Sequence, residues 1–398
     1  MSARKLWIGA LTGVVLLATA CGSSATTSGS TTSGSGKLAA ATPIKLGVMT
    51  GVQTSAVSQP WIPQAAKIAA AAVNAAGGIM GHPVQIDFCD DQATPQGAGL
   101  CAQKLLVQDK VLMMVGDDGT QEPALIPTLT TANTISWASY GASLQSLQSR
   151  RVYILAPSEA SYWVIPQMLP KTTKHVAYIL ADSAISVAAE KATVGFFPKT
   201  IKITPVTVPL TATAMQASCL QVKQSGADTA IVAINPDQVA TLIQTCNQIG
   251  LTKLLWVIPS LQMTPQVLQT VTQLHQPNLA VLSFGGAAIQ QFAADVAKYG
   301  PQVGGITNTV ADDSIGAWLG VKLLAKIIPA VGSLNAAKIN TWLGEQTAFQ
   351  TGATAPIDFA VTPIAALPRL KNLSATEGVI ENDKLVVTDP APFTIHMP

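Results

Sequence analysis

Short apolar runs that alternate with longer segments of helical period constrain the fold of this sequence most strongly. Residues 44–48, 84–88 and 111–115 are apolar or alternating runs of strand length. Two segments of helical period, 62–76 and 95–108, separate them. Strands that alternate with helices in this way predict a parallel sheet covered by helices.

The same rhythm continues along the chain and then starts again. A helix near 124–132 and strands near 134–137 and 152–155 extend the first series. A second series is predicted to contain strands at 175–180, 201–208, 229–234, 254–258 and 279–282, with helices near Ser186, Met215, Gln238 and Pro265. We therefore expect an α/β fold with two successive units, each a doubly wound parallel sheet.

The later helices, 288–299, 314–328 and 336–345, fit neither series in order. We expect some of them to return to the first unit, so that segments crossing between the units form a hinge. The expected division is a first lobe of residues 43–155 and 284–345 and a second lobe of residues 156–283 and 346–398. Short edge strands are predicted at 385–387 and 393–395, among prolines.

The N-terminus has the layout of a secretory signal. Arg4 and Lys5 precede an apolar run, 6–17, that is too short for a stable membrane span. The run ends at Leu17-Ala18-Thr19-Ala20-Cys21, which resembles a bacterial lipoprotein signal that is cut before a lipid-bearing cysteine. An ordinary cleaved signal with an incidental Cys21 is the alternative.

We predict a signal peptide at residues 1–20 and a flexible linker at 21–42, because Gly, Ser, Thr and Ala dominate the stretch after Cys21. The resemblance to a lipoprotein signal implies an extracytoplasmic protein anchored to the membrane by a lipid on Cys21. No later segment is apolar and long enough to be expected to span a membrane. The formal charge of +2 includes Arg4 and Lys5, so the mature chain is nearly neutral and nucleic acid is not an expected partner.

Besides Cys21 the chain has Cys89, Cys101, Cys219 and Cys246. An even number in a compartment that permits disulfides allows three pairings. We favour Cys89 with Cys101 and Cys219 with Cys246, because each pair lies inside one local unit; free buried thiols are the alternative. No metal site is predicted, since there is no CxxC pair and the histidines have no ligand spacing.

Motifs that carry catalysis are missing from the sequence. There is no G-x-S-x-G elbow, no H-E-x-x-H, no G-K-[ST] after a glycine-rich loop and no G-x-G-x-x-G after a strand. We therefore predict neither an enzyme nor a cofactor. An unrecognised hydrolase is the remote alternative.

Several short motifs together resemble the leucine/isoleucine/valine-binding branch of the type I periplasmic binding proteins. They are Ile44-Lys45-Leu46-Gly47-Val48, Val73-Asn74-Ala75-Ala76-Gly77-Gly78-Ile79, Asp90-Asp91 and Val115-Gly116. The resemblance implies two Rossmann-like lobes joined by three crossovers, a small-molecule ligand clamped between them, and delivery to the permease and ATPase of an ABC importer. It also implies a disulfide in the first lobe, which Cys89 and Cys101 would supply. We expect a monomer.

The resemblance places ligand-binding residues of the first lobe in loops at strand ends, where open α/β sheets bind ligands. Asp118 and Thr120 follow the third strand, and Thr120 matches a hydroxyl that contacts the ligand in the family. Asp117 and Asp118 depart from the family pattern and would repel an anion; capping of the next helix is the alternative for both.

The next strand-end loop of the first lobe contains Ala138, Ser139 and Tyr140, and Tyr140 stands where the family has a threonine. Trp61 lies near the family's first-lobe aromatic, although Ser58 is the matched position. A Trp and Tyr rim suits a neutral or aromatic solute. Core packing is the alternative for Trp61 and Tyr140.

Asp182, Ile185 and Ser260 are the predicted ligand-binding residues of the second lobe. The family has an aromatic residue near Ile185 and an acidic group that binds an ammonium near Ser260, and this chain has neither. These departures argue against a simple leucine binder and leave amino acids, amides, aromatic acids and polar metabolites open.

The predicted function is an extracytoplasmic solute-binding lipoprotein that captures a small molecule by hinge closure. A ligand-sensing receptor component of the same fold is the alternative, because the partner surface carries no local motif.

Overall fold

The computed structural model describes residues 41–52, 54, 58–117, 119–158 and 160–395, without the side chains at positions 138, 139, 184 and 185. The predicted signal peptide, Cys21, most of the linker and Asp118 lie outside the described residues. All the described residues fall within one unit of contacts, Ala40–Pro398.

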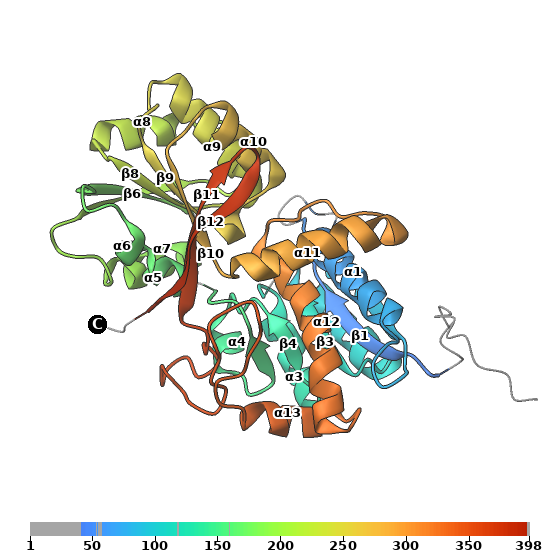
Figure 1. Ribbon diagram of the computed structural model, residues 1–398. Coiled ribbons are helices and arrows are strands. Elements are labelled where there is room, and N and C mark those ends of the chain that lie inside the picture. The colour runs from blue at the N-terminus through green and yellow to red at the C-terminus, as the bar shows by residue number, and fades with distance from the viewer. Residues whose placement is uncertain (1–40, 53, 55–57, 118, 159, 396–398) are drawn as a thin grey trace, which may run out of the picture. The chain divides into compact units, whose positions relative to one another are not determined.

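The strands of the described chain form two separate sheets (Figure 1). The first has the order β2-β1-β3-β4-β5, and all its strands are parallel: β1 Ile44–Met49, β2 Val84–Cys89, β3 Met113–Asp117, β4 Ser136–Ser139 and β5 Val152–Ile154. The alternation seen in the sequence is thus a parallel βα series, as predicted.

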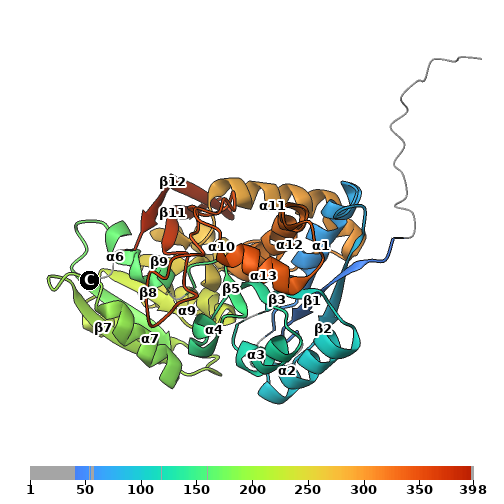
Figure 2. The ribbon, with the colours of Figure 1, turned by 90° about the horizontal axis from the view of Figure 1, so that it is seen from below.

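The second sheet has the order β12-β11-β10-β9-β8-β6-β7. Its parallel strands are β6 His175–Ala181, β7 Lys202–Val208, β8 Thr229–Ala233, β9 Leu255–Pro259 and β10 Asn278–Leu282. The antiparallel pair β11, Ser374–Glu381, and β12, Lys384–Thr394, extends it beyond β10. Figure 2 shows β7 and β12 on opposite sides of this sheet, where they form its edges.

Helices of at least eight residues cover these sheets. They are α1 Trp61–Ala75, α2 Pro95–Ala102, α3 Glu122–Thr131, α7 Ala184–Val194, α8 Gln216–Ser225, α9 Pro236–Gln248, α10 Pro265–Gln273, α11 Gly286–Tyr299, α12 Asp312–Val331 and α13 Ala336–Gly344. Shorter pieces are α4 Leu144–Gln148, α5 Ala160–Trp163, α6 Ile165–Met168, the π-helical η1 Gln103–Gln108, and the 3₁₀ turns η2 Ser260–Gln262 and η3 Gly300–Val303.

Three expectations for the secondary structure differ from the structure. β3 begins at Met113, because the amide of Val111 still donates to Leu105 in the preceding helical turn. The two predicted C-terminal strands are one continuous strand, β12, and β11 was not predicted. β11 mixes Ser, Thr, Glu and Gly with apolar residues, so its pattern lacks a clear strand period.

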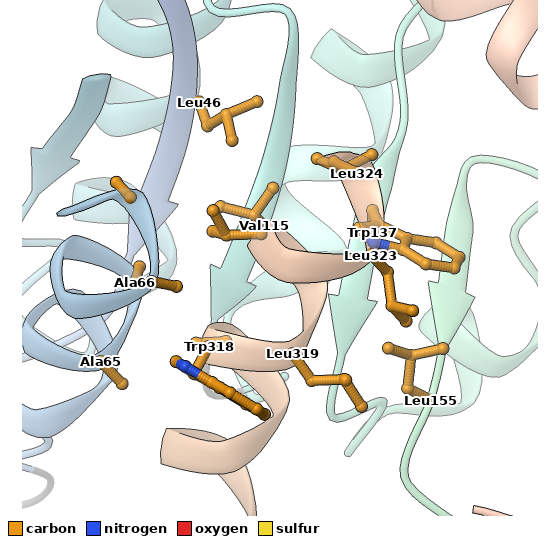
Figure 3. Close-up of a cluster of buried hydrophobic side chains, with 14 of the residues drawn as sticks. Leu46, Ala65, Ala66, Val115, Trp137, Leu155, Trp318, Leu319, Leu323 and Leu324 are labelled. Carbon is orange, nitrogen blue, oxygen red and sulfur yellow. The ribbon is translucent and has the colours of Figure 1, made fainter. Parts of the chain in front are cut away.

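The core beneath the first sheet joins segments far apart in the sequence. Trp318, Leu319, Leu323 and Leu324 of α12 lie against Leu46, Val115, Trp137 and Leu155 of the sheet side and against Ala65 and Ala66 of α1 (Figure 3). Gly116 permits this approach, since a Cβ there would lie 3.1 Å from the Cβ of Ala317. The late helix α12 thus packs on the first sheet.

α12 has the length and composition of a membrane-spanning helix, with a mean hydropathy of 1.5 over its most apolar window. The sequence analysis predicts no such segment after the signal. However, 67% of that window is buried inside the structure, and the helix contacts α1, α11, α13 and β3. Its apolar character is explained by its position in the core.

Both predicted cysteine pairs are at disulfide distance. The sulfurs of Cys89 and Cys101 are 1.94 Å apart and join β2 to α2, and those of Cys219 and Cys246 are 2.08 Å apart and join α8 to α9. Each pair therefore fastens elements around a different sheet.

The chain crosses between the sheets after β5, after β10 and before β11, and these crossings contact one another. Asn372 donates from Nδ2 to the carbonyl of Leu155 at 2.8 Å. The amide of Gly285 donates to the carbonyl of Ala353 at 2.7 Å. Three crossings held side by side give the arrangement expected for a hinge.

One segment expected with the second lobe packs on the first sheet. Phe349 and Phe359 lie with their ring centroids 6.3 and 6.0 Å from that of Trp137, and Phe359 is 5.4 Å from Tyr153. This aromatic cluster keeps residues 349–359 on the first core, beyond the boundary that the sequence predicts at residue 346.

Candidate functional site

A cavity lies where the carboxyl ends of strands from both sheets come together. Its volume is about 600 Å³, within the range of small-molecule sites. Segments after β1, β3 and β4 form what we call the first wall: Ser58, Gln59, Trp61, Thr120, Tyr140, Ala142, Ser143, Leu144 and Gln145. Segments after β6, β7, β8 and β9 form the second wall: Ala188, Leu210, Asn235, Pro236, Asp237, Leu261 and Gln262. Open α/β sheets bind ligands at this edge, so the cavity is the candidate site.

The first wall is aromatic, and a buried carboxylate behind it fixes its orientation. Asp313, in the first turn of α12, accepts hydrogen bonds from Trp61 Nε1 at 2.8 Å and from Gln59 Nε2 at 2.9 Å. The carboxylate is 7% exposed. Because both donors are bound to one buried charge, the indole and the amide are held in a single arrangement.

Tyr140 completes this wall and also belongs to the core. It is only 5% exposed and packs in the same hydrophobic cluster as Trp137 and Trp318. Tyr140 therefore lies both in the core and on the cavity, and its contact with a ligand stays a prediction.

The second wall is carried by a short turn that follows β9. The 3₁₀ turn η2 places Leu261 and Gln262 on the cavity, whereas Ser260 turns away from it. Ser260 Oγ donates to Asp312 Oδ1 at 2.5 Å, and Ser283 Oγ, after β10, donates to Asp312 Oδ2 at 2.5 Å. Asp312 thus fixes the turn that presents Leu261 and Gln262.

Burial dominates the electrostatics of Asp312. The side chain is 3% exposed, and desolvation raises its pKa to about 6, although the hydrogen bonds from Ser260 and Ser283 act in the opposite direction. This carboxyl therefore changes its charge near neutral pH.

Two adjacent residues of α12 therefore hold the two walls. Asp313 holds Trp61 and Gln59 of the first wall, and Asp312 holds the turn that carries the second. Both lie at the N-terminus of a helix, where the dipole favours negative charge.

The structure brings three of the predicted site residues together on the cavity: Trp61, Thr120 and Tyr140. Ser58, the family-matched position, also lines it. Asp182 and Ser260 are not among the lining residues, Asp182 being exposed and Ser260 buried against Asp312.

Four further predicted residues lie wholly or partly outside the description. Asp118 is outside it altogether, while Ala138 and Ser139 belong to β4 and Ile185 to α7 without described side chains. Their predicted contacts with a ligand stay predictions.

None of the residues of the second wall and few of those at the end of the first wall were predicted from the sequence. The missed residues are Gln59, Ala142, Ser143, Leu144, Gln145, Ala188, Leu210, Asn235, Pro236, Asp237, Leu261 and Gln262. Nearly all follow the carboxyl end of a predicted strand or begin a predicted helix, so the strand-end rule, applied to every strand of both series, could have found them.

No group of three or more His, Cys, Asp or Glu side chains with the geometry to hold a metal ion occurs among the described residues. Likewise, the described lining of the cavity contains no Lys, Arg or His. The site offers aromatic and aliphatic surface with a few amides, hydroxyls and one carboxylate.

A family model described as periplasmic binding protein matches residues 43–363. No curated protein matches the sequence. LivJ from Streptococcus pneumoniae, the substrate-binding protein of a branched-chain amino acid transporter in complex with isoleucine, is similar in structure, with a TM-score of 0.69 and 17% identity over 89% of this chain and 99% of that one.

Two solute-binding proteins from Rhodopseudomonas palustris are also similar in structure. The complex of one with 3,4-dihydroxybenzoic acid gives a TM-score of 0.71 and 17% identity over 89% of this chain and 98% of that one. The complex of the other with 4-hydroxybenzoate gives 0.70 and 18% identity over 89% and 97%. At such identities the likeness concerns the fold.

Proposed function

The chain belongs to the periplasmic binding protein family, of the type I branched-chain amino acid binding type that its sequence resembles, and we propose that it captures a small molecule for the permease and ATPase of an ABC importer. The family binds solutes outside the cytoplasm. In this proposal the protein acts as a monomer, and its partners are its ligand and the importer.

The cavity shared by two sheets is the observation that carries this proposal. Its lining comes from strand ends on both sides, and both walls are fastened to the first turn of one helix. A solute that enters there contacts both walls at once, which is the requirement for a clamp.

We place the first lobe around the first sheet and the second lobe around the second sheet. In this proposal the chain crosses between the lobes after β5, after β10 and in the stretch between Phe359 and β11. Closure would bring Leu261 and Gln262 towards Trp61 and Tyr140, and would exclude water from the solute.

Anchoring by a lipid on Cys21 is part of the same proposal. A tether of Gly, Ser and Thr would keep the binding unit near an importer in the membrane. Metabolic labelling with a fatty-acid analogue tests it: wild type should be labelled and Cys21→Ala should not, whereas equal labelling would contradict the anchor.

A panel of amino acids, amides, aromatic acids, polyols and nucleosides tests the binding function. A ligand at a hundred times its Kd adds about 2.7 kcal/mol to the free energy of unfolding, and small-angle scattering should show compaction with that ligand. Ligand turnover, or binding without compaction, would contradict capture by closure.

A further inference from the structure

The walls of the cavity are built from stretches without a basic residue. No Lys, Arg or His occurs in residues 46–66, 111–149, 176–190, 203–222, 224–252 and 254–274, which supply every lining residue. The nearest basic residue along the chain is Lys191, three positions beyond Ala188 on α7, and it does not line the cavity. A ligand carboxylate would therefore meet no cationic side chain.

Acidic groups lie at and behind the same surface. Asp237 lines the second wall. Asp313 stands directly behind Trp61, and Asp117 is buried at the carboxyl end of β3. Negative charge around a site with no cation disfavours an anionic ligand and favours a neutral or cationic one.

Three donor groups of the first wall serve acceptors of the protein. Ser58 Oγ donates to the carbonyl of Val52 at 2.9 Å. Gln59 Nε2 and Trp61 Nε1 donate to Asp313. A ligand acceptor would have to compete with these bonds, and the bonds to Asp313 are charge-assisted and strong.

Gln262 of the second wall offers a hydrogen-bond acceptor. Tyr162 Oη donates to the carbonyl of Val232 at 3.2 Å, so the hydroxyl oxygen accepts from Gln262 Nε2, at 3.2 Å. This fixes the orientation of the amide. Gln262 is 5% exposed, and its Oε1 accepts no hydrogen bond from any part of the chain that the structure describes.

A buried acceptor without a donor is unfavourable. Gln262 lines the cavity, although Oε1 itself has almost no exposed surface in this structure. A ligand therefore supplies the missing donor only if the turn η2 shifts as the two walls close and uncovers Oε1. An amide N–H or an ammonium meets this need, and a carboxylate at neutral pH has no proton to give.

We infer, on the basis of the proposed function, that the cavity selects small molecules with an apolar body and a hydrogen-bond-donating amide or amine end, bound to Gln262, and rejects the matching carboxylates. The apolar body would lie between Trp61 and Leu261.

Calorimetric titration of the purified full chain with matched probes tests this. On a 4-hydroxyphenyl skeleton they are 4-hydroxybenzamide, 4-hydroxybenzylamine and 4-hydroxybenzoate; on a 4-methylpentyl skeleton they are 4-methylpentanamide, 4-methylpentan-1-amine and 4-methylpentanoate. The amide or the amine should bind at least about tenfold more tightly than the carboxylate of its skeleton. If a carboxylate probe binds as tightly as the amide and the amine of its skeleton, the inference is overturned and the proposed function is not. The same holds if no probe binds but a carboxylate from the solute panel does. A panel with no ligand of any class speaks against the proposed function and the inference together.

Variants of Gln262 locate the contact. Gln262→Leu should weaken amide binding about tenfold and leave carboxylate binding unchanged, while Gln262→Glu, which keeps an acceptor and adds charge, should favour the amine over the amide. Gln266→Leu makes the same change on the exposed face of α10 and should alter neither. If Gln262→Leu does not fold, the calorimetric comparison of the probes on the wild-type protein still tests the inference. Equal weakening of amide and carboxylate binding in a folded Gln262→Leu would overturn the assignment of Gln262.

Discussion

The two walls of the cavity differ in what they present and in how they are held. The first wall presents Trp61 and Tyr140, and its polar donors point back to Asp313. The second wall presents Leu261 and Gln262 on a turn of three residues, fixed through Ser260. One wall is a rigid aromatic surface and the other offers an acceptor.

This difference teaches that neighbouring carboxylates can have separate tasks. Asp312 and Asp313 follow one another in α12, yet the first binds hydroxyls from the second-sheet side and the second binds an indole and an amide from the first-sheet side. The first turn of α12 is therefore where the positions of the walls are coupled.

We expect the largest loss of stability when either of the two cysteine pairs is removed. Cys219 and Cys246 are 27 residues apart and Cys89 and Cys101 are 12 apart. Loop-closure entropy predicts losses of about 3.5 kcal/mol for C219A/C246A and about 3 kcal/mol for C89A/C101A. Urea unfolding measures both, and a larger loss for the shorter loop would contradict the entropic account.

The pH dependence of the free energy of unfolding should reveal the contribution of Asp312. The carboxyl has a pKa of 3.8 when unperturbed and about 6 when folded, so the stability it contributes is complete below pH 4 and is lost as the pH rises through 6. Relative to Asp312→Asn, wild type should lose up to about 3 kcal/mol between pH 4 and pH 7.5. Urea unfolding at both values checks this, and a pH-independent gap between the two proteins would refute it.

Asp313→Asn should act on the first wall. An asparagine cannot accept from both Trp61 and Gln59 as the carboxylate does, so we expect a loss of about 2 kcal/mol of stability and weaker ligand binding. Asp295→Asn is the matched control, because Asp295 accepts from Trp318 Nε1 at 2.9 Å away from the cavity. It should lower the melting temperature without changing affinity; equal loss of affinity in both variants would mean that Asp313 has no specific influence on the wall.

Tyr140→Ala should produce the smallest of these effects on free energy. Removal of an aromatic surface from the first wall is expected to weaken binding about tenfold, or about 1.4 kcal/mol. Calorimetric titration with a ligand from the panel measures this. Unchanged affinity would remove Tyr140 from the site and leave it as a core residue.

The fold was predictable from the sequence because apolar strands and helical segments alternate over most of the chain. The cysteine pairing followed from local spacing. The packing of Phe349 and Phe359 with Trp137 was not predictable, because no local pattern reveals these contacts.

The first wall was predictable in part because all the motifs that carry the family resemblance, from Ile44 to Gly116, lie in the part of the chain that builds the first sheet. The second wall was not, since its loops carry leucines, amides and a proline with no recognisable motif. For Ser260 the strand-end position was informative, but the direction of its side chain depends on Asp312, which lies 52 residues away in the sequence.

The central claim, that the cavity between the two walls binds the solute, is tested most directly by blocking it. Ala188 lines the second wall and is exposed, so Ala188→Trp should fill space in the cavity without disturbing the core. With a ligand found in the panel at a hundred times its wild-type Kd, the melting temperature of wild type should rise clearly and that of Ala188→Trp should not. An equal rise in both proteins would place the ligand elsewhere and contradict the account.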